Sequence, residues 1–343
     1  MDIKQIWENW TDAESFSGVF SVSKGQEIVF EKHCGFRNQS EALPNNGETA
    51  FGIASGTKLF TGLAVCRLID CNKLSLDDRL CDVLPYDLGQ IDRRVTVHHL
   101  LTHTSGVGDY IDEEVENSMA ELQSLYDKHP VYLWERLEYY LPMITPLPPK
   151  FEPGGRFGYS NAGYVLLGLA VEAAGGVSYQ QYVTDGIINP CGLTHTGFYR
   201  TDSLPPNTAH GYMRGKGKDV WRSNIFSLPV IGGSDGGLYT CAGDLRKLWS
   251  SIFLNRILSE EMTQAFLKPH VLMDEEDDDD EDSYGLGVYM HKSSGKMFYY
   301  AVGGDYGIDF FTAFFPEQHI TASALGNTNT DTFPLLKAFL VNR

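Results

Sequence analysis

The sequence contains no apolar run that approaches the ~20 residues needed by a membrane-spanning helix. Its N-terminus, M-D-I-K-Q-I-W-E-N-W, lacks the basic and then apolar layout of a secretory signal peptide. The six cysteines form no C-x-x-C pair and show no metal-ligand spacing. We therefore expect a cytoplasmic protein with reduced thiols, no membrane span and no metal site.

Positive charge is scarce as well. The sequence has 27 Lys and Arg residues and 45 Asp and Glu residues, which gives a net charge of −18. A surface that binds nucleic acid needs lysine and arginine to neutralise phosphates, so no nucleic-acid partner is expected. Half of the acidic excess lies in residues 274–282, D-E-E-D-D-D-D-E-D. Such a run repels itself and is typical of a solvated loop. Loose Ca²⁺ binding is the alternative, although the glycine spacing of a Ca²⁺ loop is missing.

The 343 residues are enough for roughly two domains, and an apolar content of 42% is ordinary for a globular protein. The residue patterns predict strands and helices along most of the chain. Strands are expected at residues 16–22, 27–36, 285–290, 297–302, 308–315 and 320–325. Helices are expected at 3–14, 55–70 and 330–342, with further helical patterns at 97–101, 132–141 and 164–174.

Strands near both ends of the chain, with helices between them, indicate an α+β fold in which helices flank an antiparallel sheet. We predict that residues 1–90 and 226–343 form the sheet domain and that residues 91–225 form a mainly helical insertion. Residues 274–282 would be an acidic loop of the sheet domain. The cleft between the two parts is the expected place for a binding site.

Ser55 and Lys58 form an S-x-x-K motif at the start of the predicted buried helix. Side chains three residues apart lie on one face of a helix, close enough to interact. A serine hydroxyl becomes a good nucleophile when a base takes its proton, and burial makes the neutral form of a lysine accessible as that base. The alternative is a serine that caps the helix beside a surface lysine, because a four-residue pattern often arises by chance.

Tyr159 and Asn161 stand just before a second apolar helical stretch, in the segment F-G-Y-S-N-A-G-Y at 157–164. A tyrosine at this place could act as a base or proton shuttle beside a cation. Asn161 could donate its amide to a substrate carbonyl or hold Lys58. A half-buried aromatic residue of the core is the alternative for Tyr159.

Several motifs in one order resemble the serine β-lactamase and penicillin-binding-protein-like superfamily, especially its branch of esterases, D-aminopeptidases and AmpC-like β-lactamases. They are A-S-G-T-K-L-F-T at 54–61, V-H-H-L-L-T-H-T-S-G at 97–106, P-G at 153–154, Y-S-N at 159–161 and G-S-D-G-G-L at 233–238. The resemblance implies that Ser55 is acylated, that Lys58 activates it and that Tyr159 serves as general base and leaving-group acid. It also implies that Asn161 binds substrate.

The third motif of that superfamily, K-T-G or H-x-G, is where this sequence departs from the pattern. Its best match is Val302, Gly303, Gly304 and Asp305, all expected to line the substrate site. By analogy the backbone N–H groups of Ser55 and Asp305 would hold the oxyanion. Val302 stands where a cation would attract a substrate carboxylate, which puts efficient β-lactam turnover in doubt.

Two other patterns suggest different chemistry. Residues 232–236 fit G-x-S-x-G, the nucleophile elbow of α/β-hydrolases, but the residues that follow look extended rather than helical. His98, His99 and His103 suggest a metal, yet the glutamate of H-E-x-x-H is missing. We therefore expect a glycine-rich turn in the first case and histidines that cap a helix or brace a loop in the second.

The sequence thus predicts a serine hydrolase that forms an acyl-enzyme on an ester, a D-amino-acid peptide or a β-lactam, with no metal or organic cofactor. Its partner would be a small molecule or a short peptide. The alternative is a non-catalytic, penicillin-binding or regulatory protein on the same scaffold. Four aromatic residues are candidates for the pocket wall, although core packing is their commoner role. They are Tyr110, Tyr126, Trp134 and Trp221.

Overall fold

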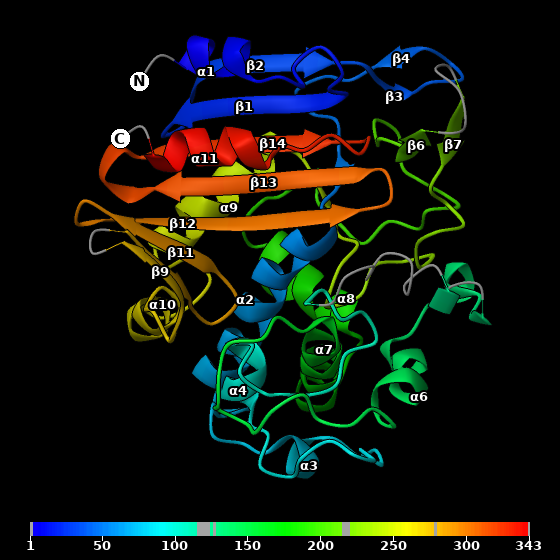
Figure 1. The fold of residues 1–343 in the computed structure, drawn as a ribbon, viewed down its shortest axis with the longest axis vertical. Helices are drawn as coiled ribbons and strands as arrows, with labels where there is room; N and C mark the ends of the chain where they lie inside the picture. The colour runs from blue at the N-terminus through cyan, green and yellow to red at the C-terminus, as the bar shows by residue number, and fades with distance from the viewer. Residues whose placement is uncertain (1–2, 115–123, 126–127, 215–219, 278–279, 342–343) are drawn as a thin grey trace.

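The centre of the molecule is an antiparallel sheet of eight strands in the order β2-β1-β14-β13-β12-β11-β10-β9 (Figure 1). The computed structural model describes residues 3–114, 124–125, 128–214, 220–277 and 280–341. Strand β1 (Gly18–Lys24) pairs along its whole length with β14 (Ile320–Gly326). The expected sharing of one sheet by strands from both ends of the chain is therefore confirmed.

The other strands of this sheet come mainly from the C-terminal third of the chain. They are β2 (Glu27–Cys34), β9 (Val271–Asp277), β10 (Asp280–Tyr284), β11 (Tyr289–Ser293), β12 (Lys296–Asp305) and β13 (Ile308–Phe315). Three short strand pairs in the described part of the chain lie outside the large sheet. They join β3 (Phe36–Asn38) to β4 (Leu43–Pro44), β5 (Phe51–Gly52) to β8 (Tyr239–Thr240), and β6 (Tyr212–Arg214) to β7 (Trp221–Ser223).

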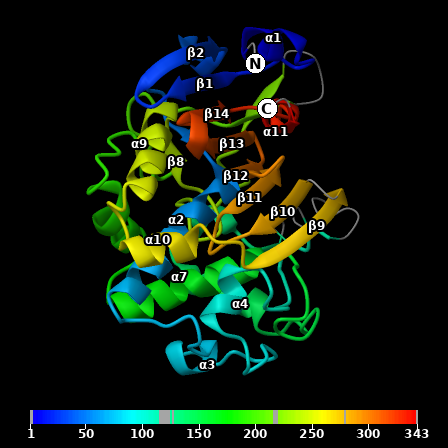
Figure 2. The ribbon, with the colours of Figure 1, turned by 90° about the vertical axis from the view of Figure 1, so that its left-hand side faces the viewer.

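Helices cover both faces of the sheet (Figure 2). Helices α1 (Ile3–Asn9) and α11 (Phe333–Val341) lie on one face, where an aromatic cluster includes Trp7, Phe20 and Phe339. Helix α9 (Ala242–Phe253) lies on the other face and contacts β14 and β1. Apolar side chains on alternate strand positions thus pack against helices on both sides, which confirms the expected α+β architecture.

Helix α2 (Thr57–Asp70) follows a 3₁₀ turn, η1 (Ala54–Gly56), and packs against α7 (Asn161–Gly175) beneath the sheet. A Cβ at Gly62 of α2 would lie 2.2 Å from the Leu286 carbonyl oxygen. A Cβ at Gly287 would lie 2.8 Å from Gly62 Cα. These two glycines let the β10–β11 turn pack directly on α2, which fixes the helix against the sheet edge.

The remaining helices are short. They are α3 (Leu80–Val83), α4 (Val97–Leu101), α6 (Leu141–Ile144), α8 (Tyr179–Val183) and α10 (Glu260–Phe266). No single helix in the described ranges is long and apolar enough to cross a membrane. One pair in the described residues, Asn161–Gly175 with Tyr179–Ile188, meets the length and composition criteria together, and it is bent by 75°.

The prediction of an acidic loop at 274–282 is wrong, because these residues largely belong to strands β9 and β10. Strand β9 is the edge of the sheet, and edge strands commonly carry charged side chains in contact with water. Side chains from β11 also pair with two of these acidic residues. Lys292 lies 3.0 Å from Glu281, and His291 lies 2.9 Å from Asp282.

Two other expected elements differ from the structure. Residues 285–290 do not form one strand, since a turn between β10 and β11 is closed by the Gly285 N–H, which donates to the Val288 carbonyl (2.9 Å). Gly287 in that turn has a φ of 110°, which a strand does not use. Residues 132–141 do not form one helix either. Two 3₁₀ turns, Val131–Leu133 and Leu137–Tyr140, precede α6 there.

The packing of α11 on the sheet predicts the effect of truncating Phe339, which is 0% exposed and contacts Phe20 and Phe315. We expect Phe339→Ala to lower the free energy of unfolding by about 3–5 kcal/mol, because it leaves a cavity among aromatic rings. Phe333→Ala in the same helix is the matched control, since Phe333 is 45% exposed. Equal losses in urea unfolding of the two variants would contradict this packing.

Candidate active site

Ser55 lies in the η1 turn directly before α2, and the short β5–β8 pair holds this turn in place. The Ile53 N–H donates to the Leu238 carbonyl (2.9 Å). The Thr57 hydroxyl donates to the Ala54 carbonyl (2.7 Å) and accepts from the Leu238 N–H (3.0 Å). Ser55 therefore stands at the N-terminus of a buried helix, where free N–H groups favour negative charge.

Lys58 is 3% exposed and its Nζ contacts three oxygen atoms. These are Ser55 Oγ at 3.0 Å, Asn161 Oδ1 at 2.7 Å and the Asp235 carbonyl at 2.7 Å. An amide oxygen and a backbone carbonyl can only accept hydrogen bonds, whereas a hydroxyl can also donate one. A neutral Lys58 would give its two hydrogens to Asn161 and Asp235 and turn its lone pair toward the Ser55 hydroxyl.

Burial lowers the pKa of Lys58, because a charged amine loses its hydration inside the protein. The nearby carboxylates of Asp235, Glu113, Asp109 and Asp305 act in the opposite direction. Burial is the larger effect, so the neutral amine is more accessible than in an exposed lysine. The arrangement can therefore remove a proton from Ser55.

Asn161 is the first residue of α7, whose N-terminus is capped twice. The Ser160 hydroxyl accepts from the Gly163 N–H (3.0 Å), and the Asp109 carboxylate accepts from the Asn161 N–H (2.6 Å). The Asn161 side chain also donates from Nδ2 to Glu113 Oε1 (2.9 Å). These bonds fix the amide with its oxygen toward Lys58, so Asn161 here holds the lysine.

Tyr159 packs its ring beside Lys58, with 4.8 Å between the lysine Nζ and the ring centroid. Ser55 lowers the pKa of this tyrosine, although burial has the larger and opposite effect. Burial raises the pKa of Tyr159 well above its ordinary value, so the side chain is a neutral phenol. Tyr159 is therefore placed to relay or donate a proton, whereas Lys58 is the better candidate for the base.

The histidines of the second motif brace loops, as expected. His103 is buried beside Tyr159, with 4.6 Å between ring centroids, and its Nδ1 accepts from the Ser160 N–H (3.0 Å). His99 and Thr96 form a reciprocal capping box at the start of α4. Burial lowers the pKa of His103 well below its usual range, so this ring is neutral.

Strand β12 brings the third motif against the Ser55 turn. A Cβ at Gly303 would lie 2.2 Å from the Ile53 carbonyl oxygen and 2.9 Å from the Ser55 nitrogen, so only glycine allows this approach. Asp305 and Gly304 line the same pocket. Val302 lines its edge and also packs against the aromatic cluster on the other face of the sheet. The oxyanion role of the Asp305 N–H stays a prediction.

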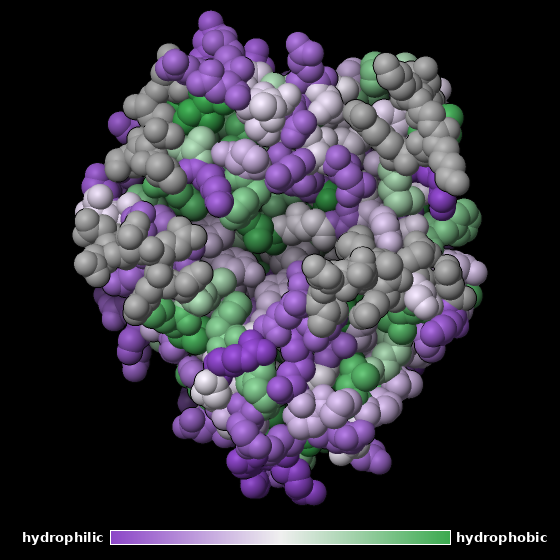
Figure 3. Space-filling view, viewed as in Figure 1, coloured by the Kyte–Doolittle hydropathy of each residue, from purple (hydrophilic) through white to green (hydrophobic). Residues whose placement is uncertain are grey.

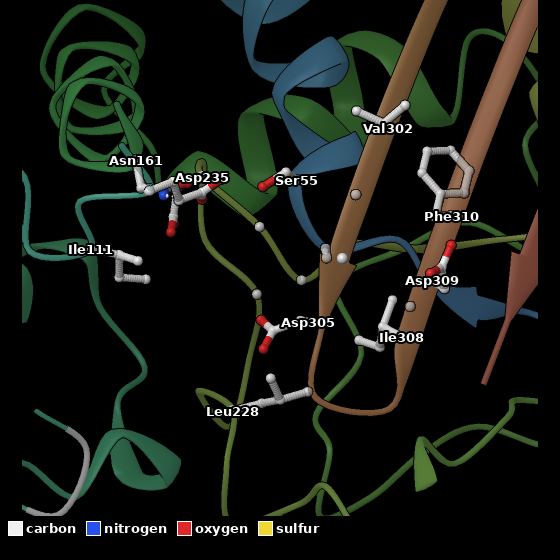
Figure 4. Close-up of a pocket in the computed structure, with 18 of the residues that line it drawn as sticks. Ser55, Ile111, Asn161, Leu228, Asp235, Val302, Asp305, Ile308, Asp309 and Phe310 are labelled. Atoms are coloured by element: carbon white, nitrogen blue, oxygen red, sulfur yellow. Dashed lines mark hydrogen bonds between the residues drawn. The ribbon is translucent and has the colours of Figure 1, made fainter. Parts of the chain in front are cut away.

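Ser55 opens into a cavity of about 790 Å³, and the surface is hollowed near the middle of the face seen in Figure 3. Figure 4 shows Asn161, Asp235 and Ser55 on one side of this pocket, and Asp305 near the end of β12. Of the four aromatic candidates for the pocket wall, Tyr110 lines it. Trp134 instead packs in the core, Trp221 lies in β7 outside the lining, and Tyr126 falls outside the described residues.

Neither the rival serine nor a metal-like cluster that the structure brings together is supported by its surroundings. Ser234, the serine of the G-x-S-x-G pattern, is 0% exposed and its Oγ has no hydrogen-bond partner in the described structure. His195, Cys241 and Asp244 form the one group in the described ranges with metal-like spacing. The Asp244 carboxylate already accepts from the His195 N–H and from Lys247, and burial raises the pKa of Cys241 to about 11. This group braces the start of α9.

Sequence reasoning missed three carboxylates that shape the site, namely Asp109, Glu113 and Asp235. Asp235 lay inside the quoted G-S-D-G-G-L motif, so it was visible but had no role assigned. Its Oδ2 accepts from the Tyr110 hydroxyl (2.5 Å). Asp109 and Glu113 lie in a loop without a spacing rule, and only the fold brings them to the start of α7.

Comparison with known proteins identifies the family of this chain. A family model described as Beta-lactamase matches residues 4–341. Penicillin-binding protein 4* of Bacillus subtilis (strain 168) is 27% identical over 306 residues, which cover 86% of this chain and 64% of that protein. The chain thus spans just under two thirds of the length of this relative.

Solved structures agree with the family model. The crystal structure of a penicillin binding protein from Bacillus halodurans aligns with a TM-score of 0.87 and 39% identity, covering 99% of this chain and 98% of that one. A D-stereospecific amidohydrolase from Streptomyces sp. shares the fold with a TM-score of 0.81 at 21% identity, covering 100% of both chains. The expected β-lactamase/transpeptidase-like fold is confirmed. The chain belongs to the beta-lactamase family.

Proposed function

We propose that this protein is a serine hydrolase that acts through an acyl-enzyme on a small ester, amide or lactam. The contact that carries the proposal is the one between Lys58 Nζ and Ser55 Oγ, at 3.0 Å. Two obligate acceptors occupy the other sides of the lysine nitrogen, so the neutral amine is oriented to take the serine proton.

The reaction would begin when Lys58 removes the Ser55 proton and Ser55 Oγ attacks the carbonyl carbon. The helix N-terminus at Ser55 favours the negative charge that develops on the carbonyl oxygen, together with the Asp305 N–H by analogy with the family. The proton would reach the leaving group through the Tyr159 phenol as the bond to that group breaks. Water would then attack the acyl-enzyme, with Lys58 again as base, and release the acid.

A penicillin-binding protein with slow turnover is the second candidate. It is favoured by Val302, which stands where the family usually has a cation for a substrate carboxylate. The intact contacts among Ser55, Lys58, Tyr159 and Asn161 favour hydrolysis instead. The two candidates differ in whether the acyl-enzyme persists after excess substrate is removed. The cytoplasmic location stays a prediction.

Replacing the nucleophile tests the proposal against its rival serine. We expect Ser55→Ala to abolish labelling by a fluorophosphonate probe and to lower p-nitrophenyl acetate hydrolysis by at least about a thousandfold. Ser234→Ala should keep both, because the Ser234 hydroxyl is buried and makes no hydrogen bond in the described structure. Loss of labelling in Ser234→Ala alone, with both variants folded by circular dichroism, would overturn the assignment.

The rate should fall as the pH is lowered, because Lys58 must be neutral to accept the Ser55 proton. Burial lowers the pKa of Lys58 from its ordinary value. Below that pKa, kcat/KM should decrease by about tenfold per pH unit. Lys58→Met should remove the activity, whereas Lys73→Met, at an exposed lysine just after α2, should keep it. A rate that is independent of pH down to about pH 4 would contradict Lys58 as the base.

A further inference from the structure

Tyr159 lines the Ser55 cavity, and His103, which lies outside that lining, binds the chain on both sides of the tyrosine. The His103 carbonyl accepts from the Gly158 N–H (2.8 Å), and its Nδ1 accepts from the Ser160 N–H (3.0 Å). The His103 ring also packs beside the Tyr159 ring, with 4.6 Å between centroids and 33° between planes. These three contacts, called here the His103 clamp, fix both the backbone and the ring of Tyr159.

The backbone of His103 is held in a conformation that side-chain-bearing residues rarely adopt. Its φ is 57°, which lies in the left-handed region that favours glycine. In this conformation the carbonyl and the ring of one residue both reach the segment 157–160. Backbone strain of this kind clusters at functional sites, so it points to a role beyond filling space.

The two nitrogens of the His103 ring have unequal surroundings. Burial lowers the pKa of His103 well below its usual range, and Lys58 adds to this shift, so the ring is neutral. Because Nδ1 accepts from the Ser160 N–H, the single ring hydrogen lies on Nε2. Nε2 is buried and has no hydrogen-bond partner in the described structure. A buried donor without an acceptor is costly, and an apolar side chain would avoid that cost, so packing alone does not explain this ring.

Other aromatic rings hold the His103 ring in place. Tyr164 and Tyr284 each lie 4.8 Å from it, centroid to centroid, and Phe157 lies 5.6 Å from it. Tyr164 is anchored in turn, because its hydroxyl donates to the Leu101 carbonyl (3.0 Å). The His103 clamp is thus backed by fully buried side chains of α7 and β10.

We propose that His103 is a positioning residue of the hydrolase, and that it holds the Tyr159 phenol where it can protonate the leaving group. The inference rests on the proposed function and names a residue that acts through Tyr159 without touching substrate. The phenol gives its proton to the leaving-group oxygen or nitrogen while the bond from that atom to the acyl carbon breaks. Protonated Lys58 returns a proton to the phenolate, so no other acid is needed. A misplacement of about 1 Å can lower such a rate about a hundredfold.

The basicity of the leaving group separates a role in proton donation from a general effect on folding. Three acetate esters, p-nitrophenyl, phenyl and trifluoroethyl, share one acyl group and have increasingly basic leaving groups. The p-nitrophenolate ion leaves without a proton, whereas trifluoroethoxide leaves far more readily when an acid protonates it. Because kcat/KM reports the steps up to acylation, the readout is the ratio of kcat/KM for p-nitrophenyl acetate to that for trifluoroethyl acetate.

Two variants of His103 differ in the acceptor that they offer to the Ser160 N–H. His103→Leu offers none, and we expect it to raise the ratio by about tenfold to a hundredfold. His103→Asn offers an amide oxygen and tolerates a positive φ, so its ratio should stay within about threefold of the wild-type value. His99→Leu is the matched control from the same motif, because His99 caps α4 instead. An unchanged ratio in His103→Leu, or an equal rise in His103→Asn or His99→Leu, would overturn the proposal.

The Tyr159→Phe variant tests whether His103 acts through the phenol. It removes the proton donor, so it should itself raise the ratio, and adding His103→Leu should raise the ratio no further. A second rise of the same size in the double variant would contradict the positioning role. Where His103→Leu does not fold by circular dichroism, His103→Ala, which leaves room for water at Ser160, takes its place in both comparisons.

Hydrogen exchange separates this inference from the proposed function. The Ser160 N–H bonds to His103 Nδ1, so its exchange rate, measured by NMR, reports the His103 clamp without turnover. Faster exchange in His103→Leu than in the wild-type protein and His103→Asn, with no hydrolysis of any ester by the wild-type protein, would support the clamp and refute the hydrolase. Hydrolysis by the wild-type protein, with one exchange rate in all three proteins, would refute the clamp and leave the hydrolase standing.

Discussion

The fold buries the Lys58 amine away from water. Its nitrogen contacts two oxygen atoms that can only accept hydrogen bonds, Asn161 Oδ1 and the Asp235 carbonyl. Each of these oxygens requires a hydrogen, and a neutral lysine has two to give. The third neighbour, the Ser55 hydroxyl, is the one that can donate to the lysine lone pair. The orientation of the base therefore follows from hydrogen-bond satisfaction, and burial provides the neutral form.

The rest of the structure holds these partners at short distance although they come from separate parts of the chain. Helix α2 carries Lys58, the start of α7 carries Asn161, and a loop before β8 carries Asp235. Two glycines allow close packing that a side chain would prevent. Gly62 lets the β10–β11 turn pack on α2, and Gly303 lets β12 pack on the Ser55 turn. The sheet joins both ends of the chain through β1 and β14, and its strands β12 and β13 supply one wall of the pocket.

The sequence predicted the residues whose chemistry is tied to local spacing. Ser55 and Lys58 are three apart at the start of a helix, and Tyr159 and Asn161 precede another, so each pair is set by short-range geometry. The partners of those residues depend on long-range folding. Glu113 and Asp235 reach the site through loops, and no local pattern encodes that meeting.

The acidic run shows the opposite limit of sequence reasoning. Charge repulsion predicted a loop at 274–282. The edge position of β9, and the pairing of Glu281 and Asp282 with Lys292 and His291 on β11, make a strand acceptable. The pattern of the run itself holds no information on which strand will lie beside it. Whether a segment forms a helix, a strand or a loop can therefore be predicted where local packing determines it. The prediction fails where the neighbouring strands of a sheet determine it.

The carboxylates around the cavity act on Lys58 against the effect of burial. Asp235, Glu113, Asp109 and Asp305 each favour the protonated lysine, which cannot take the Ser55 proton. Burial is the larger effect, so the neutral amine stays more accessible than in an exposed lysine even beside four carboxylates. The same removal of water that makes the lysine charge costly also strengthens the attraction of each carboxylate for that charge. The balance between these two effects of one buried setting decides how readily Lys58 can take the Ser55 proton.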